Sequence, residues 1–482
     1  MATASIIRKS RLEGPQRIDA EYYQPAYLAL ASRLEKCHSR TLKQLKGTLD
    51  GSAFYPSIAD LYTSAGIPFL RIDDIRNGFV QARSDTVFLP QEVLDQNSST
   101  IALCAPGDIV VAKGGNTVGR VGMLTLDYPR YALCRDLIVI RTSSLQTNRY
   151  FLLAYLLSPS GQSVMIRTAS QTGQPHLTIT SIRNLSIPHL NEKLGLHFEA
   201  ALTALYSLLR SSDERLRQAE QLLLSELGLQ NWKPSHTLAY VRNHSQATGA
   251  RRMDAEHFQP KYDDLLSIVR ANAKCCKQVR SFQAFNARGS QPTYLETGTL
   301  RVINSRHILE QHLDYDNFEH TEAECWDSQA EARVLKNDIL IYTTGANVGR
   351  ANVYLDNEKA LASNHVNILR VRDEDQIYVG FVLNSMVGRL QTRKLISGSA
   401  QAELYPNDME HFLVPFITPQ KQQQISALVQ QSHVEERQAS TLLSTAKRAI
   451  QIAIEEDETK AMDFLSKALS EISHLGLGPI AL

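Results

Sequence analysis

Residues 107–120 have the sequence GDIVVAKGGNTVGR, and residues 337–350 repeat this block as NDILIYTTGANVGR without a gap. A second block, RIDAEYYQPAY at residues 17–27, returns as RMDAEHFQPKY at residues 252–262. Both repeats keep the same order along the chain, at offsets of 230 and 235 residues. Matching blocks in a constant order are the signature of an internal duplication.

A third and looser pair of blocks extends the duplication toward the end of each repeat. TASQTGQPHLTITSIRNLSIP at residues 168–188 corresponds to ISGSAQAELYPNDMEHFLVP at residues 396–415. Chance or shared strand-turn composition could explain any one block, but not three blocks in the same order. We therefore expect two tandem units of about 230 residues that share one fold.

Between these blocks, each repeat contains short runs of alternating apolar and polar residues. Such runs, rich in β-branched side chains, are typical of half-buried strands. The runs are IPFLRI, DTVFL, DIVVA, VGMLTL and DLIVIRT in the first repeat, and TLRVI, DILIYTT, RANVYL and HVNILRV in the second. Helices are expected to begin near Pro25 and Pro260, and to cover residues 150–166 and 378–395.

A long amphipathic helix is predicted after the closing proline of each repeat. Apolar residues recur there at steps of three and four, as in a coiled-coil seam with a few polar interruptions. A solvated helix on its own domain is the alternative, but two helices in equivalent positions favour pairing with each other. The predicted fold class is α+β: two β-rich domains alternate with two long helices that pair as an antiparallel coiled coil.

These patterns predict six segments along the chain. They are a first β-rich domain at residues 1–190, a first long helix at 191–229, a linker at 230–250, a second β-rich domain at 251–417, a second long helix at 418–456 and a C-terminal tail at 457–482.

The composition disfavours several classes of protein. Hydrophobic residues make up 43% of the chain and charged residues 21%, which is ordinary for a globular protein. The sequence contains no run of about 18 apolar residues and no signal-peptide pattern at its start, so no membrane span is expected. The six cysteines form no C-x-x-C pair, which is typical of reduced thiols in a cytoplasmic protein.

The net charge of +1 gives no general attraction to nucleic acid, but the charge is unevenly distributed. Residues 1–190 carry 20 lysines and arginines against 14 aspartates and glutamates, a net charge of +6. Residues 241–417 carry 20 against 22, a net charge of −2. Any binding to DNA must therefore use local patches or partner subunits.

The common catalytic motifs are absent from the sequence. There is no G-x-G-x-x-G after a strand, no [DN]-P-P-[YF], no Walker A sequence, no H-E-x-x-H and no G-x-S-x-G. His307, His312 and His320 lie close together but lack companion ligands, and we expect them at the surface. We expect no catalytic residue, metal or cofactor, although a dispersed nuclease site would need only a few acidic residues and lysines.

The duplicated arrangement resembles the specificity (S) subunit of type I restriction-modification systems. The residues that carry the resemblance are IDAEYYQP and MDAEHFQP, the two blocks ending in NTVGR and ANVGR, and the polar loops that lead to IP or VP before a long helix. The resemblance extends roughly over residues 15–456. In that family the two globular parts are target recognition domains, and each binds one half of a split DNA sequence.

The resemblance also implies partners and a location. In that family the helices form an antiparallel coiled coil that spaces the domains and docks two methyltransferase (M) subunits, and motor-nuclease (R) subunits join through these. The implied partners are double-stranded DNA and these subunits. The implied location is the prokaryotic cytoplasm, with no association with a membrane. S-adenosylmethionine is expected only in the partner methyltransferase. The alternative is a protein-protein scaffold whose duplicated domains do not contact DNA.

Two glycine-containing hairpins are the first candidate DNA-binding elements. Glycine allows close approach of the backbone, and Asn, Thr, Lys and Arg can donate to phosphates or bases. The candidates are Lys113, Asn116, Thr117 and Arg120 in the first repeat, and Thr343, Thr344, Asn347 and Arg350 in the second. A purely structural tight turn is the main alternative, and a phosphate-binding P-loop is disfavoured because G-K-[ST] is absent.

Two polar loops and several arginines complete the candidate set. The loop residues are Ser170, Gln171, Thr172 and Gln174 in the first repeat, and Ser397, Ser399 and Gln401 in the second. Arg71, Arg76, Arg83, Arg301 and Arg306 are candidates because arginine pairs bidentately with guanine. Ordinary surface loops and solvated charges are the alternatives. Tyr22 and Tyr23 are expected to pack in the core or at a domain interface.

Overall fold

The computed structural model describes residues 4–12, 17–53, 57–81, 86–169, 175–396 and 402–473. Its contacts divide the chain into two compact units. Unit 1 comprises Met1–Arg210 with Glu436–Leu482, and unit 2 comprises Ser211–Glu435. Each unit therefore contains one of the two repeats and a part of each long helix.

The described part of unit 1 contains three sheets. Its strands are β1 (Arg40–Thr41), β2 (Thr48–Gly51), β3 (Ile67–Leu70), β4 (Ile75–Arg76), β5 (Phe79–Val80), β6 (Val87–Leu89), β7 (Leu103–Cys104), β8 (Ile109–Ala112), β9 (Val121–Met123), β10 (Tyr131–Leu133), β11 (Leu137–Arg141) and β12 (Ser186–Ile187). The strand orders are β2-β11-β8-β9-β5-β4, β6-β3-β10-β7 and β1-β12.

Unit 2 also has three sheets within its described residues. Its strands are β13 (Cys275–Gln278), β14 (Gln283–Arg288), β15 (Leu300–Ile303), β16 (Glu319–Thr321), β17 (Arg333–Val334), β18 (Ile339–Tyr342), β19 (Ala351–Val353), β20 (Ala360–Ala362), β21 (Val366–Val371) and β22 (Leu413–Phe416). The strand orders are β14-β21-β18-β19, β16-β15-β20-β17 and β13-β22.

The two units share one topology. The order β2-β11-β8-β9 of unit 1 corresponds to β14-β21-β18-β19 of unit 2, and the two other sheets correspond strand for strand. In both units the same neighbours pair in parallel, β3 with β10 and β15 with β20. Unit 1 adds the strands β4 and β5 at the edge of its largest sheet. The repeated sequence blocks therefore lie on equivalent elements.

Most of the shorter helices occupy equivalent places as well, with α7 between the repeats as the exception. The first helix of each repeat, α1 (Pro25–Lys36) or α8 (Pro260–Asn272), begins at a proline as expected. The remaining short helices are α2 (Gln91–Gln96), α3 (Arg149–Leu157), α4 (Pro159–Thr168), α5 (Ile179–Arg183), α7 (His244–Ala250), α9 (Cys325–Ser328), α10 (Gln376–Asn384), α11 (Met386–Leu395) and α12 (Pro406–Met409).

One helix prediction needs correction in both repeats. The stretches expected as single helices at residues 150–166 and 378–395 are each divided in two, as α3 with α4 and α10 with α11. The break falls at Ser158 and Ser385, whose hydroxyls accept from the amides of Gly161 at 3.2 Å and Val387 at 3.3 Å. A serine that caps a second helix in this way ends the first.

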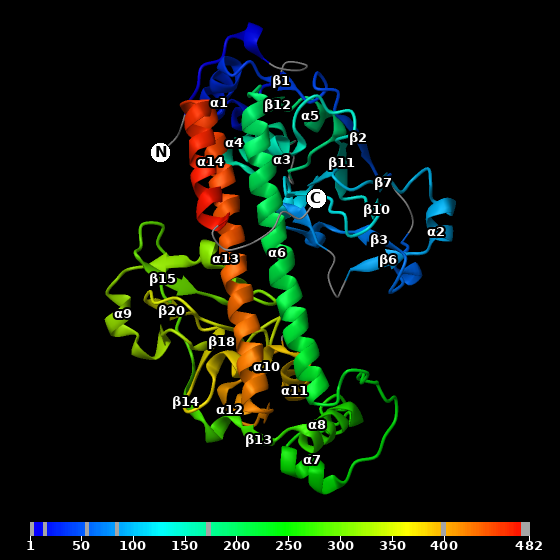
Figure 1. The fold of residues 1–482 in the computed structure, drawn as a ribbon, viewed down its shortest axis with the longest axis vertical. Coiled ribbons are helices and arrows are strands. Elements are labelled where there is room, and N and C mark those ends of the chain that lie inside the picture. The colour runs from blue at the N-terminus through cyan, green and yellow to red at the C-terminus, as the bar shows by residue number, and fades with distance from the viewer. Residues whose placement is uncertain are drawn as a thin grey trace. The chain divides into compact units, whose positions relative to one another are not determined.

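Two long helices, α6 (Glu192–Glu226) and α13 (Pro419–Glu455), lie alongside each other within each unit (Figure 1). Leu202 and Leu442 share the core of unit 1, and Leu223 and Ile425 share the core of unit 2. The helices run in opposite directions, because Lys421 at the start of α13 contacts Glu226 at the end of α6 at 3.8 Å. The predicted fold class, with two β-rich parts and two paired long helices, is confirmed.

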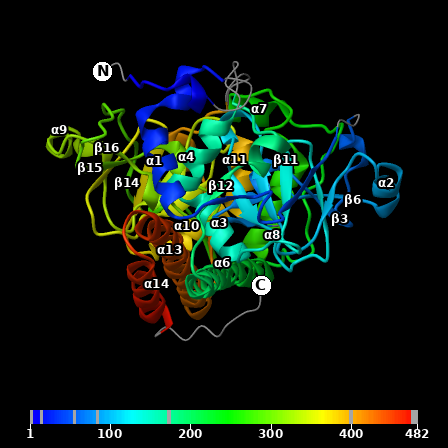
Figure 2. The same ribbon diagram turned by 90° about the horizontal axis from the view of Figure 1, so that it is seen from above.

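Part of the predicted C-terminal tail forms a further helix, α14 (Glu458–Ser473). It lies beside α13 in unit 1, where Figure 2 shows both nearly along their axes. Ala461 and Leu465 are buried in the core of this unit. The side chain of Glu458 accepts from the backbone amide of Asn191 at 2.8 Å, just before α6 begins.

Candidate DNA interface

The hairpin of unit 1 joins β8 to β9 and lies beside the chain that follows the first polar loop. The amide of Leu177 donates to the carbonyl of Lys113 at 2.7 Å, and Gly114 forms an antiparallel bridge with His176. The amide of Lys113 donates in turn to the carbonyl of Asp136 at 3.0 Å. Backbone hydrogen bonds therefore hold the base of this hairpin on both sides.

The hairpin of unit 2 joins β18 to β19 and has the same neighbours. The amide of Leu404 donates to the carbonyl of Thr343 at 2.9 Å, and Thr344 forms an antiparallel bridge with Glu403. The amide of Thr343 donates to the carbonyl of His365 at 3.1 Å. In each unit the fold thus brings the hairpin next to the segment that follows the polar loop.

The last glycine of each hairpin has a structural role. Gly119 and Gly349 have φ angles of +81° and +87°, a conformation that L side chains rarely adopt. The side-chain amide of Gln162 on α4 donates to the carbonyl of Gly119 at 2.9 Å. A Cβ at Gly349 would lie 2.5 Å from the hydroxyl of Thr392 on α11. These contacts support the structural interpretation for both glycines, independently of any ligand.

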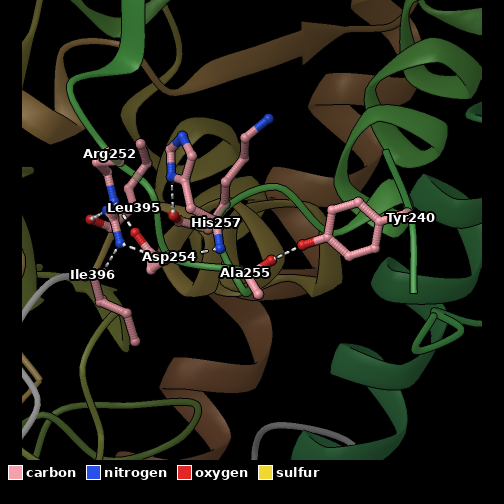
Figure 3. A network of polar contacts seen from close by, with 8 residues as sticks. Tyr240, Arg252, Asp254, Ala255, His257, Leu395 and Ile396 are labelled. Carbon is pink, nitrogen blue, oxygen red and sulfur yellow. Dashed lines mark hydrogen bonds and ion pairs between the residues drawn. The ribbon is translucent and has the colours of Figure 1, made fainter. Parts of the chain in front are cut away.

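The repeated Arg-x-Asp motif anchors the helix that precedes each polar loop. In unit 2, Arg252 donates to the carbonyls of Leu395 and Ile396 at 2.9 and 3.0 Å, where α11 ends (Figure 3). Asp254 lies beside it and pairs with its guanidinium at 2.7 Å. Terminal carbonyls of a helix lack intrahelical donors, so a cation at this position satisfies them.

His257 strengthens this anchor. Its ring donates from Nδ1 to the carbonyl of Lys394 at 2.7 Å, and its backbone amide donates to Asp254 at 3.0 Å. Burial lowers the pKa of His257, which favours the neutral ring. Burial opposes ionisation of Asp254, but the hydrogen bonds from Arg252 and His257 hold its pKa below the usual value.

Unit 1 uses the same motif at the end of α4. Arg17 pairs with Asp19 at 2.5 Å and donates to the carbonyl of Ala169 at 3.5 Å. The guanidinium groups of Arg17 and Arg167 lie 4.1 and 4.2 Å from the ring centroid of Tyr22. The hydrogen bond from Arg17 lowers the pKa of Asp19. Tyr22 and its neighbour Tyr23 are buried, as expected for packing residues.

The candidate side chains of the first hairpin differ in exposure. Asn116 and Arg120 are exposed, whereas Lys113 and Thr117 are half-buried. Thr117 donates its hydroxyl to a backbone carbonyl within the turn at 3.2 Å. Arg120 lies 3.4 Å from the exposed carboxylate of Asp73, a separation and setting in which the ion pair is weak. Asn116 and Arg120 are therefore accessible to a ligand.

The second hairpin is less exposed at the equivalent places. Thr343 is buried, and its hydroxyl lies 3.4 Å from the hydroxyl of Thr344. Thr344, Asn347 and Arg350 are half-buried. The amide of Arg350 donates to the carbonyl of Asn347 at 3.2 Å, which closes the turn.

The first-repeat arginines lie near the edge of the largest sheet. Arg71 precedes a 3-10 turn (Ile72–Asp74), and its backbone amide donates to Asp74 at 2.7 Å. Arg76 belongs to β4, and both arginine side chains are half-buried.

The second-repeat arginines are paired with carboxylates. Arg301 on β15 contacts Asp356 at 3.1 Å and Glu358 at 3.0 Å. Arg306 is exposed and forms an ion pair with Glu319. These partners reduce the positive potential of unit 2 at both positions.

The expectation that His307 lies at the surface is wrong. The side chain is 1% exposed, and its ring accepts from the amide of Asn304 at 3.1 Å. Burial, together with the neighbouring Arg306, lowers the pKa of His307 to about 4. His312 and His320 are half-buried.

Several candidates lie outside the described residues. These are Ser170, Gln171, Thr172, Gln174, Ser397, Ser399 and Gln401 of the polar loops, and Arg83. The chain on both sides of each loop is described, and it carries the helix anchor before the loop and the hairpin contact after it.

Sequence reasoning missed a cluster beside the second hairpin. Arg288 on β14 pairs with Glu403 at 2.6 Å and donates to the carbonyl of Leu404 at 2.8 Å. Its guanidinium lies 4.7 Å from the ring centroid of Tyr405, which is 44% exposed. Hydrogen bonds from Tyr405 and Arg288 lower the pKa of Glu403. Glu403 and Tyr405 lie in the loosely matched third block and Arg288 lies outside the matched blocks, and the equivalent positions of the first repeat carry different residue types, so the repeat did not point to this cluster.

Two further classes of site were searched for in the described parts of the chain. No group of three or more His, Cys, Asp or Glu side chains there is placed to hold a metal ion. No helix within the same residues combines the length and apolar character needed to cross a bilayer.

No protein-family model and no curated protein sequence matches this chain. Among solved structures, the S subunit of a type I restriction-modification system from M. genitalium is similar, with 16% identity and a TM-score of 0.36. That match covers 89% of this chain and 95% of the other.

Two further matches come from the same class of protein. The HsdS subunit from Thermoanaerobacter tengcongensis is 15% identical, with a TM-score of 0.26, over 90% of this chain and 92% of that chain. A structure described for complex assembly and conformational transition of the type I R-M system is 14% identical, with a TM-score of 0.28, over 89% and 94%. At such scores no function is carried over from these proteins. The chain is similar to type I restriction-modification S subunits, the family that its repeated motifs resemble.

Proposed function

We propose that this chain is the non-catalytic DNA sequence-specificity subunit of a type I restriction-modification or related defence complex. Each unit recognises one half of a bipartite target in double-stranded DNA. The observation that carries this proposal is the repeated topology, in which two units with one strand order each hold a hairpin beside the segment after a polar loop. Two similar domains in one chain suit a target with two halves.

The exposed hairpin side chains provide the chemistry for recognition. Contacts to phosphates position a protein on DNA, whereas contacts to base edges provide specificity. Asn116 and Arg120 are exposed on unit 1, and these residue types pair bidentately with adenine and guanine in the major groove. Because backbone bonds hold the hairpin base, little ordering of the backbone there is needed on binding.

The long helices set the separation of the half-sites and dock the M subunits, and R subunits join through these. At 1.5 Å per residue, the 35 residues of α6 span roughly 52 Å and the 37 residues of α13 roughly 55 Å. These lengths suit half-sites about one DNA turn, 34–36 Å, apart. S-adenosylmethionine belongs to the M subunits, and the complex acts in the prokaryotic cytoplasm.

A protein-protein scaffold without DNA contact is the second candidate. The ion pairs of Arg301 and Arg306 favour it, because they leave less free positive charge on unit 2. A scaffold needs no phosphate contacts, so its interactions need not weaken steeply with salt.

The decisive experiment is selection from a randomised duplex library at near-physiological salt. The full chain is copurified with the methyltransferase encoded beside it, and bound DNA is sequenced. Enrichment of a split motif with an unspecified gap is expected. Replacing residues 1–190 by the equivalent part of a related protein should change one half of the motif and leave the other half and the gap unchanged.

A matched pair of point variants makes the selection sharper. Asn116→Ala alters an exposed hairpin side chain and should relax one base position, whereas Glu471→Gln alters an exposed side chain of α14 and should leave the motif intact. A stable complex that enriches no sequence would contradict DNA recognition and favour the scaffold. Affinity that falls linearly with the logarithm of salt concentration would support phosphate contact.

A further inference from the structure

The contact between α6 and α13 contains a cluster of polar side chains in unit 2, which we call the polar layer. It comprises Ser211, Ser212 and Arg215 on α6, and Ser432 and Glu435 on α13. The hydroxyls of Ser212 and Ser432 lie 2.8 Å apart. Arg215 donates from Nε to Glu435 Oε1 at 2.8 Å, and Ser211 donates to the same oxygen at 3.0 Å.

The polar layer is buried, so its partners matter. Ser212, Ser432 and Glu435 are 3%, 2% and 2% exposed. Within the described residues, the other carboxylate oxygen of Glu435 has no hydrogen-bond partner. A buried carboxylate is tolerated only when a cation and hydrogen-bond donors face it. Glu435 therefore depends on Arg215 and Ser211 in the observed helix register.

The neighbouring positions of the contact are apolar and also bear on the register. Ala219 and Leu223 on α6, and Ile425 and Val429 on α13, belong to one apolar core. A shift of α6 by seven residues changes these contacts unevenly, because Leu223 would take the place of Leu216 whereas Glu226 would take the place of Ala219.

The same shift would disrupt the polar layer. In an antiparallel pair, moving α6 by seven residues replaces Ser212 by Ala219 opposite Ser432. It likewise replaces Arg215 by Leu222 opposite Glu435. The buried carboxylate would then face an aliphatic side chain. The free-energy penalty of an unpaired buried carboxylate therefore destabilises the shifted register and not the observed one.

We propose that the polar layer fixes the register of α6 against α13 and thereby sets the length of DNA between the two half-sites. The register follows from the contacts above, while the link to DNA length rests on the proposed function. A shift of seven residues moves a helix by about 10.5 Å along its axis. That distance corresponds to about three base pairs, at 3.4 Å per pair. The five side chains are positioning residues, because they act through the helices.

The register is tested on the full chain in complex with its methyltransferase. Spin labels are attached through unnatural amino acids at the exposed positions Gln218 and Gln423, because Cys275 is exposed and would react with thiol labels. Pulsed electron paramagnetic resonance should give one narrow distance for the native layer. In the R215L/E435L variant we expect a second population displaced by roughly 10 Å.

Two further variants distinguish a change of register from the effects of losing an ion pair or of losing the fold. The E226Q/K421Q variant removes a more exposed ion pair between the same helices, and it should keep the single distance. The S212A/S432A variant removes the hydroxyl pair with little change of volume, and it should also broaden the distribution. Replacing a buried ion pair by apolar residues is often neutral or stabilising, so R215L/E435L is expected to fold.

The same variants are then used in the randomised duplex selection. The native chain and E226Q/K421Q should enrich one gap length, and R215L/E435L should add a second that differs by about three base pairs. A single, unshifted distance in both layer variants would overturn the register assignment. Two distances with one gap length would overturn the link to DNA. If even the native chain enriches no DNA, the proposed function fails and the register result still stands.

Discussion

Unit 1 and unit 2 share their buried framework but differ at the surface. Both anchor a helix end with an Arg-Asp pair, at Arg17 and at Arg252, and both hold the hairpin by backbone bonds to the same neighbouring segments. The exposed chemistry differs, since Arg120 of unit 1 pairs with a single, highly exposed carboxylate, whereas Arg301 of unit 2 contacts two carboxylates. The comparison teaches that the duplicated motifs specify the buried framework, and that the two units diverge in the charges and pairing of their more exposed side chains.

The largest expected difference between the units is their response to acid. In unit 2, burial lowers the pKa of His307 and of His433 to about 4. Between pH 4 and pH 6.5, these histidines are protonated in the unfolded chain but remain neutral in the folded unit. Stability present above pH 6.5 is therefore lost as pH falls toward 4, by on the order of 3 kcal/mol for each histidine. Hydrogen exchange at pH 7 and pH 4.5 measures this loss unit by unit.

Unit 1 provides the internal control for that experiment. Its histidines at 38, 176 and 189 are exposed, and that at 197 is half-buried, so its described part lacks a buried imidazole. The double variant His307→Gln with His433→Gln should remove most of the pH dependence of unit 2. Equal destabilisation of both units by acid would break the comparison.

Alanine in place of the last hairpin glycine should give the next largest effect. Gly349→Ala combines a strained φ with a Cβ 2.5 Å from the Thr392 hydroxyl, and it should destabilise unit 2 by about 2–4 kcal/mol. Gly119→Ala meets only the flexible end of Gln162, at 3.1 Å, and should cost unit 1 about 1–2 kcal/mol. Chemical denaturation measures both. Gly115→Ala serves as the control, because a Cβ there would meet no other atom, so its effect on stability comes from the backbone conformation alone.

Removing hydrogen-bond donors from the two hairpins should have different effects on the salt dependence of DNA binding. Lys113→Ala with Asn116→Ala removes a cation, and should reduce the slope of log affinity against log salt by about 1. Thr344→Ala with Asn347→Ala removes only neutral groups, so that slope should stay unchanged. Fluorescence anisotropy across a salt series gives both slopes. Identical slopes for the two double variants would show that Lys113 does not contact phosphate.

The smallest expected effect comes from removing one carboxylate of unit 2. Glu319→Gln leaves the exposed Arg306 without its ion-pair partner, and we expect DNA affinity to rise by about two- to fivefold. Asp327→Asn is the matched control, because it removes a carboxylate next to Arg333, outside the candidate set. Equal gains from both variants would point to overall charge rather than to Arg306.

Much of the fold could be predicted because its local patterns are strong. Short runs of apolar, mostly β-branched residues identified β8 and β18, and steps of three and four identified α6 and α13. The division of the helix at Ser158 had a local signal in the proline that follows it, which the apolar pattern obscured. At Ser385 no proline follows, although both breaks share a glycine, Gly161 or Gly388, that lies close to a carbonyl of the preceding helix.

The candidate site was harder to predict, because burial and ion pairing depend on contacts distant in sequence. Thr343 matches Lys113 in the repeat, yet it is buried while Lys113 is half-buried. The carboxylates that neutralise Arg301 lie more than fifty residues away and reach it through the parallel pairing of β15 with β20. No local pattern encodes such a pairing.

The short pairs β1-β12 and β13-β22 have a consequence for how this protein can evolve. Each joins the beginning of a β-rich domain to its end, with Arg40 opposite Ile187 and Cys275 opposite Phe416. The chain therefore enters and leaves each domain at neighbouring points. A domain built in this way can be exchanged between genes as an insert without lengthening or redirecting the helices that follow it. Under the proposed function, one recombination event of this kind would give a new target specificity.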